Sequence, residues 1–122
     1  MKTYDLKDDQ GHVYAFEVEN ILLTRGGLSR LVRRIPGCRV IRRPTPFMRW
    51  SSKENEEFCE FEVDGASFVA QESWGDNGRF WVGPKLAEGQ TPQWSASVDR
   101  VRTAFRRARP IFGMILSLHP KS

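Results

Sequence analysis

The expected fold follows from a stretch in the middle of the chain, EEFCEFEVDGASFVAQESW (residues 56–74). Two runs of alternating apolar and polar residues flank Asp64-Gly65, a dipeptide that favours a two-residue hairpin turn. Pairing Val63 with Ala66 sends alternate side chains to a common face. We expect that face to be core, and it consists of Cys59, Phe61, Val63, Ala66, Phe68 and Ala70. The acidic opposite face is expected to be exposed, and it holds Phe58, Glu60, Glu62, Ser67, Val69 and Gln71.

The N-terminal part predicts a second hairpin and a helix. Tyr4 and Leu6 alternate with polar residues, as do residues 14–18, and turn-forming residues lie between them. A helix follows, capped by Thr24 and ending at Ile35-Pro36-Gly37, because apolar residues recur at the i, i+3, i+4, i+7 spacing. These apolar residues are Leu28, Leu31, Val32 and Ile35. A short strand over 38–43 comes next.

The C-terminal part predicts one more strand and a second helix. The turn residues 75–78 lead into a strand over 79–83, which Pro84 closes. Thr91-Pro92 has the pattern of a helix cap followed by proline at the first helical position. The apolar stripe of this helix is formed by Trp94, Val98, Val101, Phe105 and Ala108. The apolar segment 111–118 is compatible with a helix or a strand.

The order of elements is therefore ββαββββα followed by an apolar C-terminal segment. Strands joined by hairpins form antiparallel sheets, so we expect an α+β fold with about five or six strands and two amphipathic helices packed on one face. The 122 residues, 39% hydrophobic and 28% charged, are typical of a single globular domain spanning 1–122.

Several classes of protein are excluded by what the sequence lacks. No apolar run approaches the ~20 residues of a membrane span, and the first residues contain no apolar signal segment. We therefore expect a cytoplasmic protein without a membrane partner, in which Cys38 and Cys59 are free thiols. The spacing of cysteine and histidine matches no zinc motif, so we expect no metal and no cofactor.

A polar and aromatic cluster surrounds the turn near residue 76. The candidate ligand- or partner-binding residues are Glu72, Trp74, Asp76, Asn77, Arg79 and Trp81. Turns of two or four residues both place Arg79 and Trp81 on the face of Glu72, although a bulge would break this inference. One interpretation is a pocket in which Arg79 holds an anionic group between tryptophan walls. The other is structural, with Glu72 paired to Arg79 at the sheet margin and the tryptophan rings covering the core.

The same cluster is poorly equipped for catalysis. General acid–base chemistry beside Glu72 needs a second carboxylate or a histidine, and Asp76 is the one candidate. No serine or cysteine here has an identifiable base, and no phosphate-binding glycine loop opens a helix. We therefore expect no catalytic residues and a non-enzymatic protein.

The net charge of +4 conceals strong charge blocks. Residues 20–53 contain eight arginines and one lysine without an acid, whereas 54–78 contain eight acids without a base. The candidate basic face consists of Arg30, Arg33, Arg34, Arg42 and Arg43. Its first three members lie opposite the apolar residues of the first helix. The arginines of the second helix border its apolar stripe instead, and we expect them to have structural roles.

These observations favour a small binding protein whose partner is another protein, including a second copy of itself. Phe58 and Val69, if exposed, would give such an interface an apolar centre. The alternative is nucleic-acid binding by the arginine face of the first helix, although an acidic sheet face would repel phosphates. A second alternative is a pocket for a small anionic ligand around Glu72 and Arg79. The charge blocks also have a structural interpretation, in which they face each other within the fold.

Overall fold

The computed structural model describes residues 1–20, 23–42, 57–73, 78–86, 89–91 and 93–108. Its strands are β1 (Thr3–Lys7), β2 (Val13–Glu19), β3 (Cys38–Arg42), β4 (Glu57–Val63), β5 (Ala66–Glu72) and β6 (Arg79–Pro84). Its helices are α1 (Arg25–Arg33) and α2 (Ala96–Arg107). The predicted order ββαββββα and the α+β class are confirmed, while segment 111–118 lies outside the described residues.

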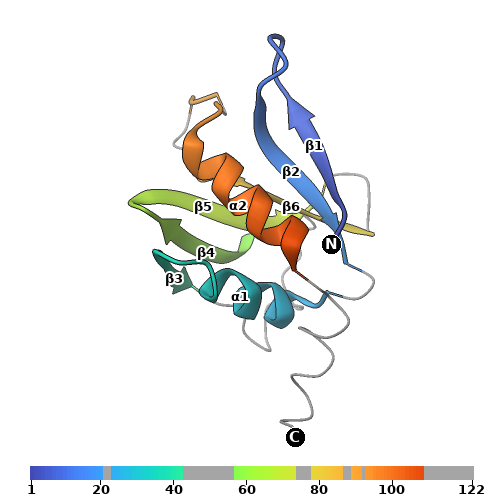
Figure 1. Ribbon diagram of the computed structural model, residues 1–122, viewed down its shortest axis with the longest axis vertical. Coiled ribbons are helices and arrows are strands. Elements are labelled where there is room, and N and C mark those ends of the chain that lie inside the picture. Colours follow the sequence, from blue (N-terminus) through green and yellow to red (C-terminus); the bar gives the residue numbers. More distant parts are fainter. Residues whose placement is uncertain (21–22, 43–56, 74–77, 87–88, 92, 109–122) are drawn as a thin grey trace, which may run out of the picture.

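The strands form one antiparallel sheet in the order β1-β2-β6-β5-β4-β3. Strand β6 therefore lies between β2 and β5, and the N-terminal hairpin joins the rest of the sheet through β6. Figure 1 shows α2 crossing in front of the sheet and α1 beside β3 and β4. Apolar residues of both helices belong to one buried cluster with one face of the sheet. We call this face the covered face and the opposite one the open face.

The central hairpin has the predicted register. Val63 pairs with Ala66, and Phe61 pairs with Phe68. The turn residues Asp64 and Gly65 have φ values of 54° and 84°, the left-handed conformation that two-residue hairpin turns require. The alternate residues predicted to be core do face the core.

A bulge in β4 changes the position of Phe58. The register shifts between Glu57 and Cys59, so the extra residue turns its side chain to the covered face. The Phe58 side chain is fully buried, with its ring centroid 4.9 Å from that of Phe80. The prediction that Phe58 is exposed is therefore wrong. Val69 does face the open side, but it is only 2% exposed, so neither residue supplies an exposed apolar centre.

Both helices bury the side chains that their spacing predicts. In α1 and the turn after it, Leu28, Leu31, Val32 and Ile35 are buried. In α2 the buried residues are Val98, Val101 and Phe105. The Phe105 ring meets the Phe16 ring of β2 edge-on at 5.2 Å, which joins α2 to the sheet.

The helix starts differ in how well the sequence predicts them. The Thr24 hydroxyl accepts a hydrogen bond from the Gly27 amide at 2.9 Å, so the predicted cap of α1 is confirmed. The second helix begins at Ala96 instead of near Thr91, because the Ser95 hydroxyl caps it. Trp94 precedes α2 and is 46% exposed, so the prediction that it belongs to the apolar stripe is wrong. Its indole Nε1 donates to the Asp99 carboxylate at 2.9 Å.

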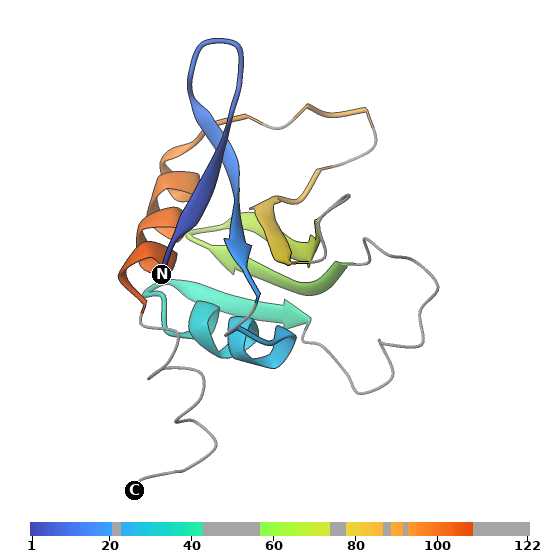
Figure 2. The same ribbon diagram turned by 90° about the vertical axis from the view of Figure 1, so that its right-hand side faces the viewer.

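The N-terminus lies at the end of α2, as Figure 2 shows. The amino group of Met1 donates to the carbonyl oxygens of Arg106 and Ala108, each at 2.7 Å. Arg106 also donates to the Thr3 hydroxyl at 3.1 Å. These contacts attach the edge strand β1 to α2.

Candidate functional site

The sheet separates the residues that the sequence predicted to be neighbours. Glu72 lies opposite Phe80 on the covered face, whereas Arg79 and Trp81 lie on the open face. The prediction of one shared face is therefore wrong. The Ser73 amide donates to the Arg79 carbonyl oxygen, which pairs these two residues across the turn. An odd number of residues lies between them. The predicted turns of two or four residues would have placed Arg79 on the same face as Glu72.

The structure describes only part of the predicted site. Trp74, Asp76, Asn77 and Arg43 lie outside the described residues. The described members of the predicted cluster are Glu72, Arg79 and Trp81, and each has its own surroundings.

Glu72 attaches the start of α1 to β5. Its Oε2 atom accepts hydrogen bonds from Nε and Nη2 of Arg25, at 3.1 and 2.8 Å. The Arg25 guanidinium also lies 5.0 Å from the centroid of the Phe58 ring. This contact with the core indicates a structural role for Glu72.

Arg79 is held on the open face by a carboxylate and an aromatic ring. Its Nη1 atom lies 3.1 Å from Oε1 of Glu17, and its guanidinium lies 3.5 Å from the centroid of the Tyr4 ring. Ser73 donates to the other carboxylate oxygen of Glu17 at 2.8 Å. The guanidinium that was expected to bind an anionic ligand is therefore engaged within the fold.

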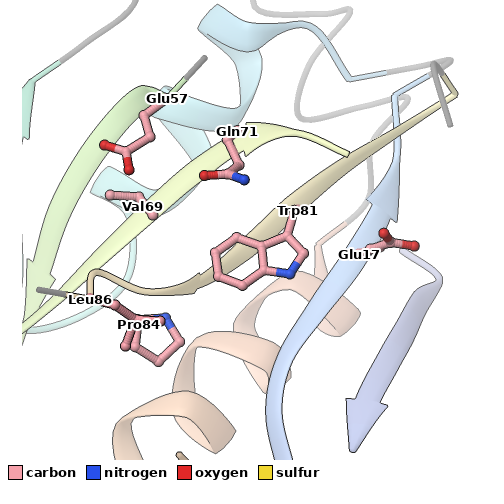
Figure 3. Close-up of a pocket in the computed structure, with 7 residues that line it drawn as sticks. All are labelled: Glu17, Glu57, Val69, Gln71, Trp81, Pro84 and Leu86. Atoms are coloured by element: carbon pink, nitrogen blue, oxygen red, sulfur yellow. The ribbon is translucent and has the colours of Figure 1, made fainter. Parts of the chain in front are cut away.

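A cleft of about 380 Å³ lies on the open face beside Trp81 (Figure 3). It is lined by Glu17, Glu57, Val69, Gln71, Trp81, Pro84 and Leu86. Trp81 is paired across the sheet with Gln71 on one side and Glu17 on the other. We call this the Trp81 cleft.

The Trp81 ring lies flat on the sheet because β6 has a glycine at position 83. A Cβ atom there would come within 2.5 Å of the indole ring and 2.8 Å of the Ala15 Cβ. The absence of a side chain gives the ring its place, and packing on the backbone fixes its orientation.

The lining of the Trp81 cleft is acidic and apolar. Glu17 and Glu57 contribute carboxylates, Gln71 contributes an amide, and no described lining residue is a cation. Sequence reasoning missed all three of these residues and Leu86. These polar residues come together because four strands pair side by side. In the sequence, only the alternation along each strand indicates that they share a face.

Among the described residues of the candidate basic face, Arg30, Arg33 and Arg34 remain as a basic surface. Arg33 and Arg34 are exposed and Arg30 is partly exposed, as their helical positions predict. None of these three forms an ion pair with another described residue. Arg42 instead donates to the carbonyl oxygen of Glu57 at 2.9 Å and to its carboxylate at 3.3 Å.

The charge blocks pair within the fold in part. Among the described residues, the acid-free block of 20–53 and the acidic block that follows it are joined by three ion pairs. These are Arg25–Glu72, Arg39–Glu62 and Arg42–Glu57. Antiparallel pairing of β3 with β4 brings the last two pairs together. The structural interpretation of the blocks is therefore supported for these arginines.

The arginines of α2 also have structural partners. Arg102 pairs with Asp5 of β1 at 2.8 Å, and each side chain is about one-fifth exposed. Arg100 contacts the carboxylate of Asp64 and the carbonyl oxygen of Pro36. These contacts tie α2 to β1 and to the central hairpin, as expected for structural arginines.

The two cysteines are free thiols, as predicted. Burial raises the pKa of the Cys59 thiol to about 11 and also raises that of Cys38. A thiol protonated at neutral pH is a poor nucleophile. Over the described ranges, no cluster of three or more metal-ligating side chains is present. Neither described helix is long and apolar enough to cross a membrane.

Comparison with known proteins assigns no family: no family model matches the chain, and neither a curated protein nor a solved structure matches it. The class of the molecule is therefore the one that its own structure defines, an α+β fold with a six-stranded antiparallel sheet.

Proposed function

We propose that this protein is a non-enzymatic binding domain that recognises another protein through the open face of its sheet. In this proposal the Trp81 cleft receives a basic side chain of the partner. The observation that supports it is a partly exposed tryptophan, packed on Gly83, in a cleft with two carboxylates. The two free thiols fit a reducing compartment, and we propose the cytoplasm.

Trp81 is suited to the centre of a binding surface. Tryptophan is among the residues that dominate binding energy at protein interfaces. The Trp81 ring already packs on Gly83, so binding would order it little further and would lose little conformational entropy. Leu86 adds exposed apolar surface beside the ring.

The charges of the lining favour a cationic group. A lysine or arginine side chain over the ring gains about 0.5–1 kcal/mol at an exposed site. Glu57 is the better acceptor for its charge, because its side chain is 40% exposed, although its Oε1 atom already accepts a hydrogen bond of 3.3 Å from Arg42. Glu17 is 18% exposed, and both of its oxygens already accept hydrogen bonds. An anionic ligand is disfavoured by the same lining.

Selection of random peptides displayed on phage tests this proposal, because it needs no candidate partner. We expect peptides selected on the wild-type protein to carry lysine or arginine beside apolar residues. Glu57→Gln should weaken their binding about fivefold, the equivalent of about 1 kcal/mol for one charge-assisted hydrogen bond. Trp81→Ala should abolish it, with circular dichroism to show that the variant is folded.

Glu62→Gln is the matched control. Glu62 is also an acid of β4 on the open face, and it pairs with Arg39 of β3 as Glu57 pairs with Arg42, but it does not line the cleft. Equal loss of binding in both variants would contradict the proposal, as would selection of acidic peptides. A rise in mass with concentration that Glu57→Gln removes would identify a second copy as the partner.

A further inference from the structure

We infer that the outward face of α1 binds the phosphate backbone of a nucleic acid, through Arg30, Arg33 and Arg34. This surface is separate from the Trp81 cleft, because α1 packs on the covered side of the sheet. The inference therefore does not depend on the proposed protein partner.

The geometry of α1 places the three arginines on one surface. Arg30 is followed by Arg33 and Arg34 at the i+3 and i+4 positions, which are neighbours on a helix. The apolar residues Leu28 and Val32 point the other way and are fully buried. The arginines are therefore directed outward, and the position of Arg30 and Arg33 in the last turn of α1 favours the helix dipole by only about 0.3–1 kcal/mol each.

These three charges are not neutralised within the described part of the chain. Six other described arginines each form an ion pair, and they are Arg25, Arg39, Arg42, Arg79, Arg100 and Arg102. Arg30, Arg33 and Arg34 differ from them in having no such carboxylate among the described residues. A polyanion could therefore bind without first displacing an acid of the protein.

A further arginine, Arg107, lines a groove between α2 and the turn that follows α1. The groove, of about 480 Å³, has Pro36 on one side and Arg107 on the other. Arg107 is exposed. The acid of this groove, Asp99, accepts a hydrogen bond from Trp94 and lies 3.7 Å from Arg102.

The acidic residues expected to repel a nucleic acid lie on the other side of the sheet. Glu60 and Glu62 are on the open face, away from α1, and each has a cation. Lys85 lies 2.9 Å from Glu60, and Arg39 lies 3.1 Å from Glu62. Repulsion of a phosphate backbone at α1 by these acids is reduced by both distance and pairing.

The chemistry of the surface favours nucleic acid over other anionic partners. A protein interface needs an apolar centre, and a membrane-surface helix needs apolar side chains to insert. The apolar side chains of α1 are buried, so its outward face offers neither. Guanidinium groups match phosphate oxygens in geometry and charge. Contacts to phosphates alone predict binding that is independent of base sequence.

Fluorescence anisotropy with a labelled DNA duplex of mixed sequence tests the inference. Three phosphate contacts predict a slope of about −2.7 for log affinity against log salt, or about 40-fold weaker binding at about 200 mM than at about 50 mM salt. The triple variant Arg30→Gln/Arg33→Gln/Arg34→Gln should bind at least about tenfold more weakly, with a slope near zero.

The control variant removes the same net charge from the open face. Its substitutions are Arg39→Gln, Arg42→Gln and Lys85→Gln, and we expect it to bind DNA within about twofold of wild type. Circular dichroism checks that both variants are folded. Equal weakening of both variants would overturn the inference, as would an absence of binding at about 50 mM salt. Tighter binding to anionic lipid vesicles or to polyglutamate than to the duplex would also overturn it. Glu57→Gln should leave DNA binding unchanged, so the two proposals can fail separately.

Discussion

The two faces of the sheet are built from different interactions. The covered face is apolar, and its phenylalanines at positions 16, 61 and 68 are almost completely buried beneath the helices. The open face is polar, and its side chains are joined by ion pairs such as Arg39–Glu62 and Lys85–Glu60.

This difference separates stability from recognition. Burial of a large apolar side chain stabilises a fold by about 1.5–3 kcal/mol, whereas an exposed ion pair contributes about 0–1 kcal/mol. Substitutions on the open face can therefore change what the protein binds with little risk of unfolding it. The same holds for the outward face of α1, because its arginines are outside the core.

The largest effect should come from Phe58, at the bulge that adds a side chain to the covered face. We expect Phe58→Ala to lower the free energy of unfolding by about 3–5 kcal/mol, because it leaves a cavity beside Phe80. Val69→Ala on the open face is the comparison, with an expected loss of roughly 1–2 kcal/mol. Urea denaturation of both variants measures the difference. Equal losses would show that the open face contributes to stability as strongly as the covered face.

A second effect should appear at alkaline pH, because Cys59 is buried on the covered face. Its pKa of about 11 in the folded protein exceeds the ordinary value of 9.0, so folding favours the protonated thiol. This contribution is complete below pH 9 and is lost as the pH rises toward about 11. The loss is on the order of 3 kcal/mol. Unfolding curves from pH 8 to 11 should fall less steeply for Cys59→Ala than for wild type; parallel curves would refute this.

The smallest effect should come from the ion pairs, and it sharpens the contrast between the faces. We expect the Arg39–Glu62 pair of the open face to contribute less than about 1 kcal/mol, since Arg39 is 72% exposed. The Arg102–Asp5 pair under α2 should show the larger coupling energy, because water screens it less. Double-mutant cycles to glutamine and asparagine, at low and high salt, measure both energies. A larger coupling at Arg39–Glu62 would reverse the comparison.

Local patterns predicted most of the fold. The turn Asp64-Gly65 determined the register of the central hairpin, and the apolar spacing of α1 determined which side is buried. These features depend on residues close together in the chain, so a sequence pattern records them directly. The exposed arginines of α1 were predictable for the same reason.

The errors arose where one extra residue changes the face to which the side chains of a strand point, and where a second capping residue close by decides a helix start. An extra residue in β4 turned Phe58 inward. The connection between β5 and β6 contains an odd number of residues, so Arg79 and Glu72 lie on opposite faces of the sheet. Trp94 left the helix stripe because Ser95 offers a cap. The Trp81 cleft was beyond prediction, since Glu17 and Glu57 are 40 positions apart and only the strand order β2-β6-β5-β4 brings them to one face.

The two strands at the ends of the described sheet also bear on aggregation. Both β1 and β3 are only five residues long, and each has a register irregularity. Each also carries cations, Lys7 in β1 and Arg39 and Arg42 in β3. Short, bent and charged margins are poor templates for an added strand. The sheet is thereby protected from growing, copy by copy, into a fibril.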